Sequence, residues 1–466
     1  MSPLHAVFAA LALLFAPPSA AATEAPNVVL IVIDTLRADH LGSYGYSRPT
    51  SPRLDALAAS GARFAGARAT SGWTAPSVAS ILTGLYPLKH GVDLPGSRLH
   101  PSIPTLAQQF KAAGYTTVAY SANPAFVSPR QGFDAGFGEF YVLHSGVADD
   151  KVDTDIVPGG PTAGKPLKVA EANQVTDQAI EWLGRTDTTA HPFFLYAHYF
   201  DPHGGYYPPV KYAERFGVPA DSPMLNVEQR EFWKKPPGEK DLHTLVSLYD
   251  GEIAFTDAEI GRLLDALPES RPTLIVVTAD HGEEFADHGG MSHGRTLWEE
   301  MLHVPLIFYG EGVKPGVVLN QGVTIADVTP SILELASLPP LAGLDGESLA
   351  SGVRNGAEPP SRLLFADMTK AQKGQDMIHR HAALQGSWKL LQNMDASFGM
   401  YDLASDPSER EDRLAQERAR AQPLETTLAV RDSRKKNLTG WRARPLPTVA
   451  LSDEDKERMR ALGYEP

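Results

Sequence analysis

Two uninterrupted apolar runs, each leading to an acidic residue, constrain the fold of this chain most strongly. Val28 to Ile33 contains no polar residue and is followed by Asp34, and Leu274 to Val277 leads within three residues to Asp280 and His281. Such runs are typical of strands buried on both faces of a mainly parallel sheet. Open α/β sheets assemble their sites at the carboxyl ends of these strands. We therefore expect Asp34, Asp280 and His281 to meet at one edge of a doubly wound sheet.

A third segment adds a hydroxyl group. Thr74 precedes Pro76, a residue favoured in the first turn of a helix, and the residues through Leu82 are apolar enough to continue that helix. Thr74 would then lie where backbone N–H groups and the helix dipole favour an anion. Taken singly, an acid at a strand end is most often a cap or an ion-pair partner, and a Thr before a Pro is most often structural.

The combination of these side chains is more informative than any one of them. Two carboxylates, an imidazole and an alkoxide form a mixed oxygen and nitrogen shell for one divalent cation. We therefore predict Asp34, Thr74, Asp280 and His281 as metal ligands, with Thr74 also as the catalytic nucleophile.

Further motifs occur in a fixed order along the chain. They are Pro26 to Asp34, Ser51 to Ala58, Thr74 to Ser77, Leu82 to Pro87, His90-Gly91, Asp201-Pro202-His203, Tyr249 to Glu252, Asp280 to Glu284, His293-Gly294, Val304-Pro305, Asp327 to Pro330, Tyr401 to Leu403 and Asp406-Pro407. In this order they resemble the sulfatase family of the alkaline phosphatase superfamily. The resemblance implies an alkaline-phosphatase-like α/β fold with a doubly wound, mostly parallel sheet and a small C-terminal α+β subdomain. It also implies a metal-dependent hydrolase of sulfuric or phosphoric esters.

The chain departs from that family at the nucleophile. Formylglycine sulfatases make an aldehyde hydrate from a Cys or Ser at the position of Thr74, but oxidising a Thr would give a ketone, and the chain has no Cys. The unmodified hydroxyl of Thr74 must serve instead. Four further positions differ: Val78 replaces an Arg, Thr35 replaces a second Asp, Ser121 to Pro124 replaces a Gly-Lys-Trp-His run, and His293 replaces a Lys.

These departures leave three functions open. The first is a sulfatase that works through Thr74. The second is an enzyme like the threonine branch of the superfamily, which includes phosphodiesterases and phosphoethanolamine transferases. The third is a non-catalytic relative that binds an anion. The expected cofactor is one divalent metal ion, either zinc, manganese, calcium or magnesium, and His281 and Thr35 shift the preference towards zinc or manganese.

Two histidines extend the predicted site. A histidine in a Gly-rich loop is most often structural or exposed on general grounds, but His203 and His293 match positions of the resembled family. We therefore predict that they bind the transferred group or protonate the leaving oxygen. His198, His288 and His303 receive no role at this stage.

The 466 residues, with 42% hydrophobic content, can bury a large core, and 40 Gly and 38 Pro indicate many loops. We expect a catalytic domain over 26–351, a linker over 352–360 and a C-terminal subdomain over 361–466. Helices are expected at Ser51 to Ser60, Thr105 to Ala113, Val169 to Leu183, Asp257 to Leu267 and Asp453 to Leu462, with a strand at Trp388 to Leu391 and a solvated helix at Ser408 to Arg420.

Residues 1–22 contain an apolar run followed by small residues, a pattern typical of a secretory signal peptide. We expect secretion, with the periplasm as the destination, and no stable membrane span, because the run is far shorter than the roughly 20 residues needed. The formal charge of -14 argues against nucleic acid as a partner, since that requires a basic surface. The expected partner is a small anionic ester substrate, and the oligomeric state stays open.

Overall fold

The computed structural model describes residues 24–145, 168–226, 232, 236–370, 378–393, 395–436 and 456. The predicted signal peptide, the predicted terminal helix apart from Lys456, and most of the segment between His144 and Lys168 lie outside these residues. Among the described residues, no helix combines the length and apolar composition needed to cross a membrane.

An eight-stranded sheet forms the centre of the molecule, with the strand order β12-β2-β11-β8-β1-β7-β3-β4. All neighbouring strands pair in parallel except β11, which runs antiparallel to β2 and β8. The central strands β1 and β7 are buried along their whole length, as the uninterrupted apolar run of β1 predicts. The strands are β1 (Asn27–Ile33), β2 (Ala62–Arg68), β3 (Thr116–Ser121), β4 (Glu139–Val142), β7 (Phe193–Tyr199), β8 (Thr273–Ala279), β11 (Leu306–Gly310) and β12 (Val317–Thr324).

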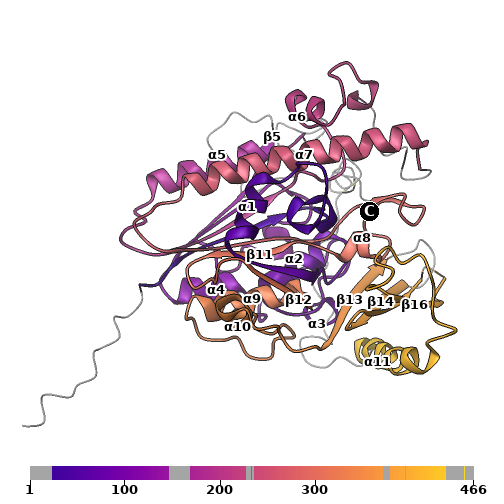
Figure 1. Ribbon diagram of the computed structural model, residues 1–466. Coiled ribbons are helices and arrows are strands. Elements are labelled where there is room, and N and C mark those ends of the chain that lie inside the picture. Colours follow the sequence, from indigo (N-terminus) through magenta and orange to yellow (C-terminus); the bar gives the residue numbers. More distant parts are fainter. Residues whose placement is uncertain are drawn as a thin grey trace, which may run out of the picture.

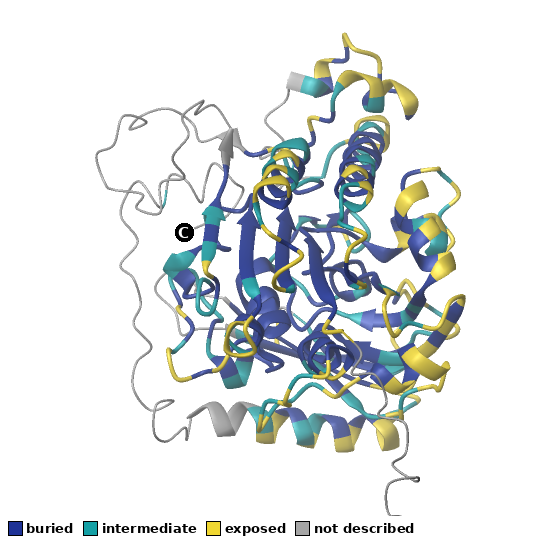
Figure 2. Cartoon of the chain, turned by 90° about the vertical axis from the view of Figure 1, so that its left-hand side faces the viewer, coloured by how far each residue is buried: buried dark blue, intermediate teal, exposed yellow. Residues whose placement is uncertain are grey.

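Helices cover both faces of this sheet, so the fold is a doubly wound α/β sandwich (Figure 1). Helices α5 and α7 run side by side along one face, and α4, α9 and α10 lie on the other. In the burial view the strands form a dark, buried centre and the exposed residues gather at the periphery (Figure 2). The helices are α1 (Pro52–Ser60), α2 (Thr74–Thr83), α3 (Pro87–His90), α4 (Leu106–Ala112), α5 (Ala172–Arg185), α6 (Val210–Arg215), α7 (Glu239–Asp265), α8 (Glu299–Leu302), α9 (Val328–Leu335), α10 (Ala350–Asn355) and α11 (Arg418–Lys436).

The longest helix differs from its sequence prediction. We expected a helix from Asp257 to Leu267, but α7 begins 18 residues earlier, at Glu239. Gly251, which disfavours a helix by its intrinsic propensity, sits inside it. A Cβ at that position would lie 2.9 Å from the side chain of Pro208, so close packing against the preceding loop explains the glycine.

A second, antiparallel sheet forms the C-terminal region, in the order β13-β14-β15-β16, with α11 packed against it (Figure 1). Its strand β15 contains the predicted strand at Trp388. The expected linker over 352–360 starts inside α10, so its first residues are helical. The strands are β13 (Leu363–Lys370), β14 (Ile378–Gln385), β15 (Trp388–Gln392) and β16 (Phe398–Asp402). Two short pairs lie elsewhere in the described residues: β5 (His144–Ser145) with β6 (Lys168–Val169), and β9 (Glu284–Phe285) with β10 (Met291–Ser292).

Buried ion pairs join the C-terminal region to the large domain. Lys389 of β15 is fully buried, and its Nζ lies 3.1 Å from Oε1 of Glu299 and 2.9 Å from Oε1 of Glu409. Glu299 also accepts a 2.8 Å hydrogen bond from Nε of Arg68. The prediction of a helix over 408–420 is wrong except for its last residues, because the segment forms turns and loop until α11 begins at Arg418. Most of the segment is exposed or half-buried, as predicted, but Glu409 is buried in this network.

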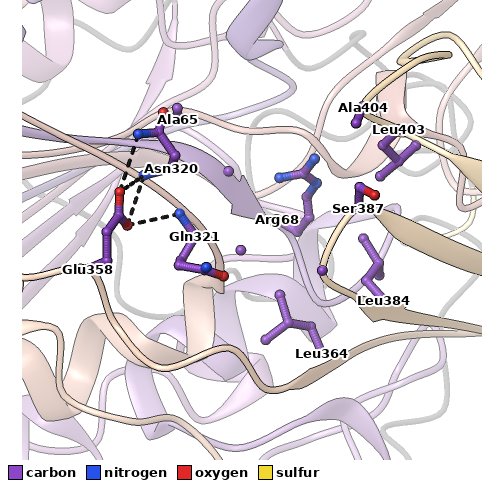
Figure 3. Close-up of a pocket in the computed structure, with 13 residues that line it drawn as sticks. Ala65, Arg68, Asn320, Gln321, Glu358, Leu364, Leu384, Ser387, Leu403 and Ala404 are labelled. Carbon is purple, nitrogen blue, oxygen red and sulfur yellow. Dashed lines mark hydrogen bonds between the residues drawn. The ribbon is translucent and has the colours of Figure 1, made fainter.

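A cavity of about 410 Å³ opens at the seam between the two regions (Figure 3). Leu364, Leu384 and Leu403 supply its apolar lining, and Glu358 accepts hydrogen bonds of 2.9 and 3.0 Å from the backbone N–H groups of Asn320 and Gln321. It shares no lining residue with the site described next.

Candidate active site

Four neighbouring strands of the large sheet deliver polar side chains to one edge. Asp34 follows β1, Asp280 and His281 follow β8, His198 is the penultimate residue of β7, and Asn123 lies just beyond β3. The register aligns these ends, because Ile33 pairs with Ala279 and Val32 pairs with His198. The sheet order β8-β1-β7-β3 therefore places residues from distant parts of the sequence side by side.

Each of the two carboxylates at this edge has one oxygen that accepts hydrogen bonds and one that accepts none within the described chain. Oδ2 of Asp34 accepts a 2.8 Å hydrogen bond from Nδ2 of Asn123, and Oδ1 of Asp280 accepts hydrogen bonds from the backbone N–H groups of Thr35 (3.2 Å) and His281 (2.9 Å). Among the described residues, Oδ1 of Asp34 and Oδ2 of Asp280 have no hydrogen-bond partner, although both side chains are fully buried. Burying a carboxylate oxygen without a hydrogen-bond partner costs free energy. A cation bound by these two oxygens would offset that cost.

His281 lies between these two oxygens. Its Nδ1 is 2.8 Å from the carbonyl oxygen of Gly282, so this nitrogen carries the proton and Nε2 keeps its lone pair. Nε2 lies 3.2 Å from Oγ1 of Thr74, 3.6 Å from Oδ1 of Asp34 and 3.5 Å from Oδ2 of Asp280. Ligands of a tetrahedral site with bonds of about 2.1 Å lie roughly 3.4 Å apart. All three separations from Nε2 of His281 are close to that value, which fits a cation held beside His281.

The electrostatics of the carboxylate pair support this interpretation. Burial and the charge of Asp34 raise the pKa of Asp280 to about 6. Burial also opposes ionisation of Asp34, but a hydrogen bond from His198 and the nearby histidines hold the pKa of Asp34 below its usual range. Two carboxylates this close favour one shared proton unless a cation is present. Below about pH 6, a cation would therefore have to displace a proton from Asp280 on binding.

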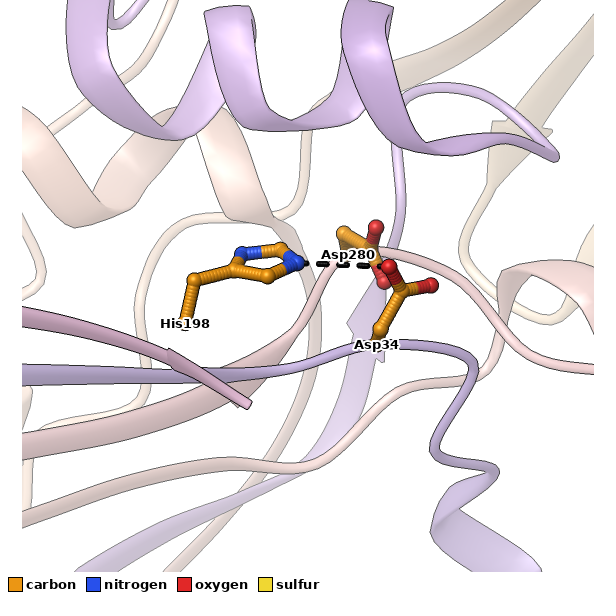
Figure 4. Close-up of side chains that lie close together, drawn as sticks. All are labelled: Asp34, His198 and Asp280. Carbon is orange, nitrogen blue, oxygen red and sulfur yellow. Dashed lines mark hydrogen bonds and ion pairs between the residues drawn. The ribbon is translucent and has the colours of Figure 1, made fainter. Parts of the chain in front are cut away.

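His198 belongs to the site, although the sequence analysis assigned it no role. Asp34, His198 and Asp280 each offer a ligand atom within 4.8 Å of the others, and their side chains converge (Figure 4). However, Nε2 of His198 lies 3.3 Å from Oδ2 of Asp34, the oxygen that already accepts from Asn123. We therefore interpret His198 and Asn123 as the pair that orients Asp34, leaving Oδ1 for the metal. The position of His198 near the end of the mainly apolar strand β7 is the signal that a sequence search could have used.

The two predicted catalytic histidines lie beside His281. The ring centroid of His293 is 4.7 Å from those of both His203 and His281, and His203 stacks on Phe200 at 4.2 Å. Burial lowers the pKa of His203 to about 4 and lowers that of His293 well below its ordinary value. Without a bound anion, both rings are therefore neutral at neutral pH.

Glu283 holds His293 in place, a contact that the sequence did not predict. Its Oε1 lies 3.0 Å from Nδ1 of His293, and its Oε2 accepts a 3.0 Å hydrogen bond from the hydroxyl of Tyr206. Glu283 is fully buried. This contact fixes the orientation of the His293 ring beside His281.

Thr74 occupies the first residue of α2, as predicted, and α2 is buried along all ten of its residues. Val78, one turn further along the helix, is buried and supplies no charge. Thr35 contributes a backbone N–H group to Asp280, where the resembled family has a second acidic ligand. The departures read from the sequence thus remove positive and negative charge from the neighbourhood of Thr74.

Comparison with known proteins identifies the family. Residues 26–338, more than half of the chain, match the family model described as Sulfatase. The chain belongs to the sulfatase family. A second model, described as N-sulphoglucosamine sulphohydrolase, C-terminal, matches residues 287–435 of this sulfatase. The chain is thus a sulfuric ester hydrolase-like enzyme, as the sequence resemblance predicted.

Individual relatives agree with this assignment. A sulfatase from Formosa agariphila is 25% identical over 426 residues, covering 83% of this chain and 82% of that protein. A protein solved in complex with its substrate D-glucosamine-2-N,6-O-disulfate superposes with a TM-score of 0.71 at 19% identity, over 89% of this chain and 98% of that one. The phosphonate monoester hydrolase of Agrobacterium radiobacter gives a TM-score of 0.68 at 23% identity, over 89% and 96%. These superpositions confirm the predicted fold.

Proposed function

We propose that this enzyme cleaves sulfuric or phosphoric esters of small anionic substrates through the hydroxyl of Thr74. The observation that carries the proposal is the position of Oγ1 of Thr74, 3.2 Å from Nε2 of His281 and at the first residue of α2. The same nitrogen of His281 lies 3.6 Å from Oδ1 of Asp34 and 3.5 Å from Oδ2 of Asp280, and these three residues would hold one divalent cation. Zinc or manganese suits this set of two carboxylates, one imidazole and one hydroxyl best.

The cation, when bound, supplies Lewis-acid chemistry that lowers the pKa of a hydroxyl and polarises a substrate oxygen. Thr74 attacks the sulfur or phosphorus atom in line, its hydroxyl proton passes to water as the new ester bond forms, and the leaving alcohol departs on the opposite side. His293 or His203, protonated beside the bound anionic substrate, donates a proton to the leaving oxygen, and water then hydrolyses the Thr74 ester. The N–H groups at the start of α2 favour the negative charge that develops.

A phosphoric or phosphonic ester is the second candidate substrate class. Val78 and Thr35 remove an Arg and an Asp that the resembled sulfate pocket uses, Ser121 to Pro124 replaces its Gly-Lys-Trp-His run, and His293 replaces a Lys. Those differences favour the threonine branch, in which an unmodified Thr attacks phosphorus. A phosphonate monoester hydrolase among the structural neighbours has the same fold.

Turnover of matched nitrophenyl esters separates these possibilities. The metal-reconstituted protein would be given the sulfate, the phosphate, a phosphate diester and a phosphonate, each also after treatment with a chelator. Thr74→Val keeps the shape of the side chain without its hydroxyl and should reduce turnover on the order of 10³-fold or more, whereas Thr74→Ser keeps the hydroxyl and should retain activity. Unchanged turnover in Thr74→Val would exclude Thr74 as the nucleophile, and ligand binding without turnover would favour the non-catalytic relative.

We also propose export of this enzyme to the periplasm, on the strength of the signal-peptide pattern in residues 1–22. Fractionation of cells expressing the full chain, with the N-terminal residue of the product determined, tests this. Recovery of the uncleaved chain in the cytoplasm would contradict it.

A further inference from the structure

Tyr249, on helix α7, has no place in the chemistry above, yet its hydroxyl lies directly behind the loop that follows Asp34. This hydroxyl donates a 2.7 Å hydrogen bond to the carbonyl oxygen of Thr35 and accepts a 3.0 Å hydrogen bond from the backbone N–H of Arg37. Tyr249 is fully buried. One side chain on a long helix thus bridges both ends of the turn that leaves β1.

The turn that Tyr249 bridges is strained. Thr35 has φ +55°, a left-handed conformation that a β-branched residue rarely adopts. Such a conformation persists only where the surroundings hold it. The backbone N–H of Thr35 is also the group that donates to Oδ1 of Asp280. The strained residue therefore sets which oxygen of Asp280 stays available for a cation.

Arg37 extends the bridge to the loop that follows β8. Its guanidinium donates hydrogen bonds to the carbonyl oxygen of Glu283 (3.1 Å) and to Oδ2 of Asp287 (2.9 Å). Glu283 lies two residues beyond His281 in the chain. The two loops that carry the predicted metal ligands are thus tied to each other through Arg37 and to α7 through Tyr249.

We propose that Tyr249 is a positioning residue for the metal site: its hydroxyl holds Thr35 in the left-handed conformation that aims Asp280 at the cation. The proposal rests on the proposed function to the extent that a cation binds at Asp34, Asp280 and His281. Without the hydroxyl, the turn relaxes towards extended backbone, and the N–H of Thr35 turns away from Asp280. Metal affinity then falls although no ligand has changed.

Tyr44 offers a matched control, because its hydroxyl makes the same pair of bonds elsewhere in the fold. It donates to the carbonyl oxygen of Phe64 (3.1 Å) and accepts from the backbone N–H of Leu306 (2.9 Å), between β2 and β11. Tyr44→Phe therefore removes the same type of bridge without touching either ligand-bearing loop.

The experiment is a Zn²⁺ titration of the metal-free full chain against a chromophoric chelator, with thermal unfolding followed with and without Zn²⁺. We expect Tyr249→Phe to weaken Zn²⁺ binding about 10-fold or more, as loss of a group supporting a metal ligand does. We expect Tyr44→Phe to bind Zn²⁺ within about twofold of the wild type, since its site is independent. Both variants should lose similar thermal stability in the metal-free form, whereas only Tyr249→Phe should lose part of the stabilisation by Zn²⁺.

A second variant keeps the test decisive if Tyr249→Phe fails to fold. Glycine adopts φ +55° without strain, so Thr35→Gly in the Tyr249→Phe background should restore folding or Zn²⁺ affinity. Wild-type Zn²⁺ affinity in Tyr249→Phe, or no rescue by Thr35→Gly, would overturn the positioning role while leaving the Thr74 mechanism intact. Absence of Zn²⁺ binding by the wild type would overturn both proposals.

Discussion

Acid should destabilise the helix that carries Thr74, because His90 must stay neutral to hold it. His90 is fully buried; its Nδ1 accepts a 3.0 Å hydrogen bond from the backbone N–H of Val92, and its Nε2 lies 3.1 Å from the carbonyl oxygen of Pro76 and 3.2 Å from Oγ of Ser80. Pro76 and Ser80 belong to α2. A proton added to Nδ1 would face the N–H of Val92 and break that hydrogen bond.

The size of the effect follows from the pKa. Burial lowers the pKa of His90 from 6.5 to about 4. As the pH falls, the unfolded chain therefore binds the proton before the folded chain does. The stability contributed by the neutral ring is complete above about pH 6.5 and is lost progressively down to about pH 4, with a total of about 3 kcal/mol at 1.36 kcal/mol per pH unit.

Urea unfolding of the wild type and of His90→Asn, each from about pH 7.5 to about pH 4, isolates this contribution, because the other titrating groups are common to both proteins. We expect the wild type to lose about 3 kcal/mol more than the variant across that range. A difference in unfolding free energy that does not change with pH would refute the assignment of a neutral, depressed His90.

Two substitutions test other parts of the account. Lys389→Met should cost about 3–5 kcal/mol in urea unfolding, because it leaves buried carboxylates without their cation. Lys89, whose Nζ lies 2.8 Å from Oδ1 of Asp345 in a partly exposed ion pair, is the control, and Lys89→Met should cost about 1 kcal/mol or less. Equal losses would contradict the burial of the Lys389 network. Gly282→Ala should abolish turnover, because a Cβ there would overlap a backbone carbonyl oxygen beside His281. Gly184→Ala, in a helix with open space around it, should leave turnover unchanged, and an active Gly282→Ala would contradict the packing.

The residues that the sequence predicted best are those whose local pattern carries the information. Asp34 and Asp280 stand at the ends of strands that are buried on both faces, and such strands are recognisable as apolar runs. Thr74 is placed by Pro76 in the first turn of its helix. In these cases the position of the residue in its own strand or helix determines where its side chain lies, so the local sequence is enough to predict it.

The residues that the sequence did not predict depend on which strands become neighbours. His198 and Asn123 orient Asp34 only because β7 and β3 follow β1 in the sheet order, and nothing local encodes that order. The sequence analysis placed Tyr249 in a family motif but assigned it no function. Its hydroxyl contacts Thr35, which lies 214 residues away along the chain. Glu409 was expected at the surface because charged side chains are usually exposed. It is buried instead, and its ion pair with Lys389 compensates the cost of that burial.

The central claim is that the hydroxyl of Thr74 forms a covalent ester with the substrate. Mass spectrometry of the metal-reconstituted enzyme, quenched in acid during turnover of the best nitrophenyl ester, tests it most directly. We predict a sulfuryl or phosphoryl group on the peptide that contains Thr74, absent from Thr74→Val and lost on chelation. An unmodified Thr74 peptide in rapidly turning-over enzyme, together with full activity of Thr74→Val, would contradict the account.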